Sequence, residues 1–265
     1  MGVSLTTTVA ISGYLAGSRL LDEVLVQTLD ITRSQSADAF GPFVTLLGLV
    51  YSVILGQIYS YYFDRQGVIQ DAIFEESAQI KALQGCVEVV ADRYAPVQRA
   101  AWLGVLQAHA TELLATGFDG SVKNDERSMT PLVALVDALE RATPGGNVAA
   151  AGPSSSALLR LASDSVGRVA SARSRRVSAV TAKLPPVQTL TQRLIAFVLL
   201  LGFVLVDLGA PKLEALLFGT ITGCFYLINS FLSDLAEPFG GSWSVDPARD
   251  EVESLARALK MTESA

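Results

Sequence analysis

The sequence predicts an all-α integral membrane protein with three transmembrane helices and a helical domain on the cytoplasmic or stromal side. Three observations predict this class. The 265-residue chain is 50% apolar and only 17% charged, whereas a soluble domain usually has about 25% charged residues. Charge-free stretches are long enough to cross a bilayer, and apolar residues between them recur at helical spacing.

The composition also excludes several classes of function. A net charge of −6 argues against nucleic-acid binding, and a mean hydropathy of +0.40 argues against disorder. Two cysteines, Cys86 and Cys224, are too few for a disulfide framework or a zinc site. The sequence lacks a Walker loop, a dinucleotide-binding fingerprint and a GxSxG motif, so we predict no enzyme, no cofactor and no bound metal.

His109 is the one histidine of the chain, which excludes mechanisms that need a histidine cluster. With Glu75 and Glu76 it forms a carboxylate–histidine set that lacks metal-ligand spacing. We therefore interpret His109 as a surface or core residue.

Residues 1–38 are predicted to form an amphipathic helix. Apolar residues after Leu15 have roughly helical spacing, but Arg19, Asp22 and Glu23 interrupt the segment. Charges are costly in hydrocarbon, so we place this helix at the membrane interface or docked on the other helices. The alternative is a fourth transmembrane span.

The first transmembrane helix is predicted over residues 39–63, a stretch of 25 residues without charge. About 20 apolar residues are enough to cross the hydrocarbon. Residues 194–234 are predicted to form a transmembrane hairpin, with helices at Leu194–Gly209 and Leu213–Asp234 joined by a turn with Gly and Pro. The alternative for this pair is a buried hairpin in a soluble protein.

The orientation follows from the basic residues near the membrane ends. The segment Arg160–Arg193 contains seven basic residues and one acid, whereas the short turn of the hairpin has only Lys212. Arg65, just after the first span, lies on the same side as the basic segment. We therefore predict that residues 64–193 and the tail lie on the cytoplasmic side, or on the stromal or matrix side in an organelle. The sequence does not distinguish a plasma membrane from an organellar one.

Residues 64–193 are predicted to form the helical domain. The chain continues as a helix to a boundary at Pro96, and a flexible loop rich in Gly, Pro and Ser is expected over residues 143–156. Four helices are predicted, with these bounds: Asp64 to the Pro96 boundary, Val97–Leu114, Pro131–Arg141 and Ala157–Leu184.

The last of these helices is basic and directly precedes the hairpin. Arg173, Arg175 and Arg176 are candidates for binding anionic lipid headgroups. The alternative is that the arginines are a topology signal and nothing more.

Residues 235–265 form the carboxyl tail. A Pro-Phe-Gly-Gly sequence cannot continue a helix, so the chain should turn sharply where it leaves the membrane. Phe239 and Trp243 are expected at the membrane interface, where aromatic rings are favoured. A final amphipathic helix is predicted over Pro247–Lys260.

The tail resembles the bestrophin-like domain family, whose members often end with an apolar span, an Asp-Leu pair and a Pro-Phe-Gly turn. The matching residues are Asp234, Leu235, Pro238, Phe239, Gly240, Gly241 and Val245. Two other segments are similar to the family: Arg65 followed by Glu75-Glu76, and the Arg-rich helix Arg168–Lys183 followed by Leu-Pro-Pro and a hairpin. The resemblance covers residues 46–252 and implies a membrane protein.

A more remote similarity links Glu237-Pro238-Phe239-Gly240 to the bestrophins proper, which are pentameric anion channels. Bestrophins have a longer acidic run after this segment, and that run binds calcium. Here residues 241–244 take its place, with Asp246 as the one nearby acid. Calcium needs six to eight oxygen ligands, so the sequence does not support calcium gating.

Two patterns of small residues favour close helix packing. Gly48, Ser52, Gly56 and Ser60 repeat every four residues in the first span, and Gly219 and Gly223 form a GxxxG in the third. This packing occurs either between subunits of an oligomer or within one subunit.

Polar side chains within the spans are candidates to line a pore, because hydroxyl and amide donors replace part of the water shell of an anion. The candidates are Gln57, Thr220, Thr222 and Asn229. The alternative is that they form hydrogen bonds between helices.

We therefore predict a bestrophin-like membrane protein that forms a homo-oligomer and conducts anions. The alternative is a non-conducting scaffold or accessory subunit that binds lipid or a protein partner through the helical domain. In both cases the lipid bilayer is the expected environment, and no nucleic acid is bound.

Overall fold

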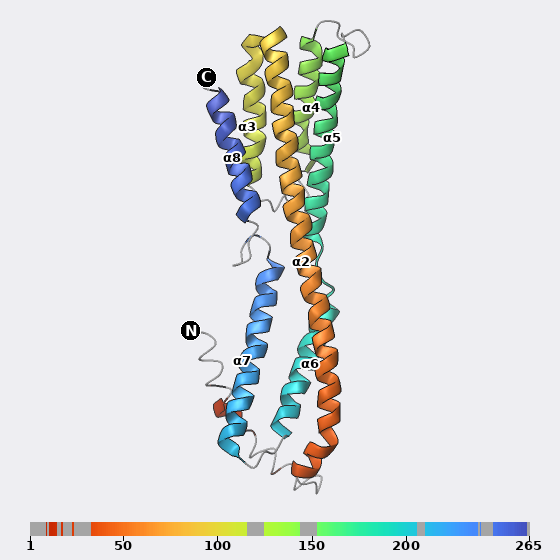
Figure 1. The fold of residues 1–265 in the computed structure, drawn as a ribbon, viewed down its shortest axis with the longest axis vertical. Coiled ribbons are helices and arrows are strands. Elements are labelled where there is room, and N and C mark those ends of the chain that lie inside the picture. The colour runs from red at the N-terminus through yellow and green to blue at the C-terminus, as the bar shows by residue number, and fades with distance from the viewer. Residues whose placement is uncertain are drawn as a thin grey trace. The chain divides into compact units, whose positions relative to one another are not determined.

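In a computed structural model, the secondary structure of the described residues is entirely helical (Figure 1). The structure describes residues 33–115, 125–143, 153–205, 210–237, 239 and 246–263, together with a few positions among the first 32. Three helical segments are long and apolar enough to cross a membrane: Gly41–Tyr94, Ser155–Val204 and Pro211–Ala236. The predicted all-α membrane class is confirmed.

The chain divides into two compact units. The spanning unit consists of residues 1–63 and 183–237 and contains the charge-free stretches. The bundle unit consists of residues 64–182 and 238–265. Each unit is described by itself below.

The spanning unit is built from the first half of α2 (Arg33–Tyr94), α6 (Pro186–Leu205) and α7 (Pro211–Ala236). Its small core is formed by Tyr51, Ala196 and Leu199, and the Tyr51 ring meets the Phe225 ring edge-on at 5.1 Å. Most other side chains on these helices are apolar and exposed, as expected for surfaces that face lipid.

The helices α2 and α6 approach closely at Gly202. A Cβ atom on this glycine would lie 2.5 Å from Val44 Cγ2, which is shorter than real contacts of a Cβ atom. The absence of a side chain at Gly202 therefore permits this packing.

Tyr14 attaches the amino-terminal segment to α7. Its hydroxyl donates to Glu214 Oε2 at 3.0 Å, both residues are buried, and its ring packs 5.0 Å from that of Phe218. Most of the amphipathic helix predicted over residues 1–38 lies outside the described residues, although its last six residues belong to α2.

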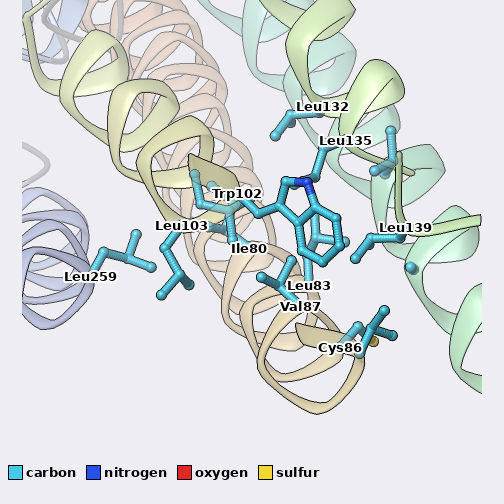
Figure 2. Close-up of a cluster of buried hydrophobic side chains, with 14 of the residues drawn as sticks. Ile80, Leu83, Cys86, Val87, Trp102, Leu103, Leu132, Leu135, Leu139 and Leu259 are labelled. Atoms are coloured by element: carbon cyan, nitrogen blue, oxygen red, sulfur yellow. The ribbon is translucent and has the colours of Figure 1, made fainter. Parts of the chain in front are cut away.

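The bundle unit contains the second half of α2 and the remaining helices. These are the short 3-10 helix η2 (Pro96–Gln98), α3 (Arg99–Ala115), α4 (Asp125–Ala142), α5 (Pro153–Thr181) and α8 (Asp246–Glu263). Their main core is apolar and is centred on Trp102, with Ile80, Leu103, Leu139 and Leu259 around it (Figure 2). The final helix α8 packs along α3.

Several helices begin earlier than predicted. The helix predicted from Pro131 begins at Asp125, the helix predicted from Ala157 begins at Pro153, and the helix predicted from Leu194 begins at Pro186. The helices α5 and α6 begin with proline, which is well suited to the first position of a helix because its missing N–H needs no partner there. The prediction instead took the start of each apolar run as the helix start, and these helices extend into polar sequence.

The loop predicted over residues 143–156 is therefore shorter. Thr143 follows α4 as a bend, and residues 153–156 already belong to α5. The part between, residues 144–152, lies outside the described residues. The basic helix also ends at Thr181, not at Leu184, because Pro185 and Pro186 restrict the residues before them.

Candidate functional site

A polar pocket of about 190 Å³ lies within the spanning unit, between α2, α6 and α7. Its apolar wall is formed by Ile58, Leu232 and Ala236. Its polar wall comprises Tyr62, Thr189, Gln192, Arg193, Asn229 and Ser233.

Helical periodicity brings these polar residues together. Thr189, Gln192 and Arg193 are at positions i, i+3 and i+4 of α6, and Asn229 and Ser233 are four residues apart on α7. Residues at these spacings share one face of a helix. The two faces meet because α6 and α7 pack against each other.

The pocket is rich in hydrogen-bond donors, and none of the described residues that line it is acidic. Arg193 is its permanent cation, and no hydrogen bond or ion pair joins Arg193 to another described residue. Gln192 is only 3% exposed, and its side-chain amide lies beside the Tyr51 hydroxyl of α2. The arrangement suits a negatively charged ligand better than a positively charged one.

Of the four predicted pore-lining residues, the structure brings only Asn229 into this pocket. Its Nδ2 donates to the Phe225 carbonyl of its own helix at 2.9 Å. The hydroxyls of Thr220 and Thr222 likewise bond to carbonyls one turn earlier, so the alternative of bonds between helices is not observed for these three residues. Gln57 is exposed on the surface of the single chain.

The predicted small-residue patterns lie in different environments. Gly219 and Gly223 are buried, and a Cβ atom on Gly48 would just reach Leu199 Cδ2 at 4.0 Å. The rest of the first pattern, Ser52, Gly56 and Ser60, is exposed on the single chain. A close helix contact also lies at Gly202, which sequence reasoning missed because this glycine lies alone in an apolar run.

The three arginines predicted to bind lipid headgroups all lie in the bundle unit. Arg173 and Arg176 are buried, with 8% and 1% exposure, and Arg175 forms an ion pair with Glu75. Arg176 Nη2 lies 3.3 Å from Glu76 Oε2. The sequence placed all three on one basic helix, but the acids of α2 that pair with Arg175 and Arg176 are about 100 residues away and could not be assigned from spacing.

His109 completes this buried cluster. Its Nε2 lies 3.3 Å from Glu76 Oε1, and both side chains are buried. The sequence left a surface and a core position open for His109, and the structure places it in the core. Within the ranges described, no group of three or more His, Cys, Asp or Glu side chains could hold a metal ion.

The tail motif is described only in part. Asp234 lies in the last turn of α7, and its carbonyl accepts a hydrogen bond from the Glu237 N–H at 3.2 Å. Phe239, expected at the membrane interface, packs against the cluster of Ile69, Ile73 and Val252 in the bundle unit. The remaining motif residues, Pro238, Gly240 and Gly241, and also Trp243, lie outside the described residues.

A comparison with protein families identifies the family of this chain, because one family model matches most of its length. The family model described as "Bestrophin-like domain" matches residues 15–250. The chain belongs to the bestrophin-like family. The resemblance inferred from the tail motif is thus confirmed, and the match extends beyond the residues on which that inference rested.

Solved structures show the same fold for this bestrophin-like protein. A bacterial bestrophin homologue from Klebsiella pneumoniae carrying one mutation has a TM-score of 0.67 at 15% identity, covering 98% of this chain and 100% of the other. The same organism's homologue solved by zinc phasing has a TM-score of 0.59 at 17% identity, covering 99% and 96%. A protein described only as a membrane protein has a TM-score of 0.69 at 14% identity, with full coverage of both chains.

These identities are low, so the likeness concerns the fold. No curated protein sequence matches the bestrophin-like chain significantly. Family membership and three apolar helices of sufficient length together identify a multi-pass membrane protein.

Proposed function

We propose that this bestrophin-like protein assembles into an oligomer that conducts small anions across a membrane. The observation that supports the proposal is the polar pocket of the spanning unit, whose described lining combines an arginine and several donors and includes no acidic residue. An anion that crosses a bilayer must exchange its water shell for such groups. The proposal includes no catalysed reaction and no calcium gate.

The outer surface of α2 supports assembly into an oligomer. Gln57 is exposed beside Ser52, Gly56 and Ser60, on a helix that is otherwise apolar at this level. An amide that faces hydrocarbon is costly unless a partner or water covers it. A neighbouring copy of the chain, or a water-filled pore at the centre of an oligomer, would meet this need.

Chloride flux into liposomes that contain the purified protein tests the proposal. We expect flux above that of empty liposomes, and we expect Asn229→Leu to change it because this residue lines the pocket. The matched control is Leu227→Ile, an exposed apolar position on the same helix, which should leave flux unchanged. Absence of chloride flux at several pH values and voltages would contradict conduction.

A second function, that of a non-conducting scaffold, is favoured by a different feature. A groove of about 530 Å³ in the bundle unit lies between α4 and α5, with Met129, Val133, Asp137 and Arg173 in its lining. A protein partner that copurifies with the wild-type chain and is lost in Val133→Asp would support this function. A chain that purifies alone as a monomer would contradict it.

A further inference from the structure

We propose that the buried contact between His109, Glu76 and Arg176 is a proton-sensitive latch, which holds α3 against α2 and α5 and loosens as the solution becomes acidic. The three residues come one each from α3, α2 and α5 of the bundle unit. The proposal does not depend on anion conduction, because it concerns how the helices of the bundle unit hold together.

The latch is closed off from solvent. The Glu76 side chain is 0% exposed, and those of Arg176 and His109 are 1% and 3% exposed. One carboxylate oxygen, Oε1, lies 3.3 Å from His109 Nε2, and the other, Oε2, lies 3.3 Å from Arg176 Nη2. A single buried carboxylate of α2 therefore contacts both α3 and α5.

The surroundings of the His109 ring indicate which of its nitrogens carries a proton. Nε2 faces a carboxylate oxygen, so it donates to Glu76. Nδ1 is buried and has no hydrogen-bond partner among the described residues. A neutral imidazole protonated at Nε2 has only an acceptor at Nδ1, whereas the imidazolium would place a second N–H there. A buried N–H without an acceptor is costly, so this contact fits the neutral ring.

The balance of charge favours the same state. Glu76 and Arg176 have opposite charges, so a proton on His109 would leave one excess positive charge in the buried cluster. Arg173 is a further buried cation, three residues before Arg176 on α5. Glu76 attracts an imidazolium, but its carboxylate already faces a permanent cation. Its two oxygens face Nε2 and the guanidinium, so it offers no acceptor to a proton on Nδ1.

The rest of the bundle unit does not compensate an added charge. Among the described residues of this unit, Glu76 is the only buried acid. Glu75 and Glu112 lie on the same helices as Glu76 and His109 but are not buried, and Glu75 pairs with Arg175. The helices α8 and α4 contribute apolar side chains to the core around α3: Ala248, Val252, Leu255, Leu259, Leu132, Leu135 and Leu139. On α8, Glu251 pairs with Lys81 at the surface.

Acid should therefore weaken the latch. When α3 opens, the imidazole is hydrated and takes up a proton near neutral pH, as histidine ordinarily does. The closed bundle binds fewer protons at His109 than the open one, so its stability falls as the pH falls. One proton is involved, so the equilibrium constant for opening rises by at most about tenfold for each pH unit. Exposed carboxylates titrate at about pH 4, below the range in which His109 acts.

Hydrogen exchange of α3 tests the latch in the full-length protein in detergent, purified without a histidine tag. Protection factors over residues 99–115, corrected for the intrinsic exchange rate at each pH, are compared between wild type and His109→Gln from about pH 8 to pH 5. Glutamine keeps an N–H for Glu76 but does not titrate.

We expect the opening constant of α3 to rise by up to about tenfold per pH unit in wild type and to stay nearly flat in His109→Gln. The matched control is Glu75→Gln, which removes the partly exposed pair with Arg175. This control should keep the pH dependence of the wild type, because the buried contact of Glu76 is unchanged.

Nuclear magnetic resonance reads the protonation state directly, because the chain has one histidine. In protein labelled with ¹⁵N at histidine, one pair of ring signals reports both the tautomer and the charge. We expect a neutral ring with its proton on Nε2 while α3 is protected, and the imidazolium only as α3 opens. This measurement needs no variant, so it decides the matter even where His109→Gln fails to fold.

Two results would overturn the proposal. The first is an imidazolium in a bundle whose α3 keeps its protection, since the buried contact would then tolerate the charge. The second is a pH dependence of α3 opening that is the same in wild type and His109→Gln, since the proton would then bind elsewhere.

Discussion

Arg65 of α2 holds the end of α5 by donating from Nε to the Ala179 carbonyl at 2.8 Å. Its Nη2 also donates to the next carbonyl, that of Val180, at 2.7 Å. The last carbonyls of a helix have no partner within the helix and carry partial negative charge, so a guanidinium suits this position. The contact joins positions more than 110 residues apart in the sequence.

This relationship brings together two segments that carry the resemblance to the family. Glu75 and Glu76 lie further along α2 and pair with Arg175 and Arg176 of α5. The acidic and basic segments are therefore two sides of one contact within the bundle unit.

We predict that Arg65→Gln lowers the stability of the bundle unit by about 1.5–3 kcal/mol, the usual value for hydrogen bonds to a charged group. Amide hydrogen exchange should increase in the last turn of α5, near Ala179. The control Arg168→Gln, at an exposed position of the same unit, should have little effect. Unchanged exchange at the end of α5 would show that Arg65 does not hold this turn.

Glu76 is buried between Arg176 and His109, so removal of its charge should lower the stability of the bundle unit strongly. We predict that Glu76→Gln destabilises the bundle unit by about 3–5 kcal/mol, because the charge of Arg176 then stays buried without its counter-ion. Thermal unfolding of the purified protein measures the loss. Glu75→Gln is the matched control: its pair with Arg175 is partly exposed and should contribute about 0–1 kcal/mol. Equal effects of the two substitutions would contradict this difference.

The bundle unit should lose stability in alkaline solution because of Cys86. Burial raises the pKa of this thiol above its ordinary value of 9.0. The folded state thus holds the proton more tightly than the unfolded state. The stabilising contribution is complete below pH 9 and is lost as the pH rises through the raised pKa.

Unfolding midpoints measured between pH 8 and pH 11 check this expectation. Cys86→Ala should flatten the alkaline decline, whereas Cys224→Ser should not. A maleimide should react with Cys86 only after unfolding, because the side chain is buried. Rapid labelling of Cys86 in the native Cys224→Ser protein would be inconsistent with this burial.

The contact at Gly202 should be intolerant of larger residues. We predict that Gly202→Leu destabilises the spanning unit by about 1–3 kcal/mol, because its side chain collides with Val44 and separates α2 from α6. The double variant Gly202→Ala with Val44→Ala should recover most of the loss, as measured by thermal unfolding. Gly67→Ala, which meets nothing within 4 Å, is the control. A Gly202→Leu protein as stable as wild type would show that the helices need not approach here.

Much of the architecture could be predicted from the sequence because it depends on local properties. The charge-free lengths of residues 39–63 and 215–233 are sufficient to indicate spans, since crossing a bilayer depends on hydropathy and length. Helix starts were predicted less well, because Pro153 and Pro186 begin helices in polar sequence that has no apolar signal.

The candidate site depends on contacts between distant segments. Asn229 could be singled out as a polar residue in an apolar helix. Nothing in the sequence around it indicates that Gln192 and Arg193 lie in the same pocket. The same holds for His109, which the sequence shows as a lone histidine and the structure places against Glu76.

The sequence by itself determined that the chain is a helical, multi-pass membrane protein of the bestrophin-like family, because hydropathy, helical period and short motifs are properties of contiguous residues. Only the tertiary structure decided which charges neutralise one another and which do not. Arg176 and Arg193 look alike in the sequence, yet Arg176 packs against a buried glutamate and Arg193 lines a pocket whose described lining residues include no acid. That difference arises from helix packing, which brings together side chains that the chain order keeps far apart.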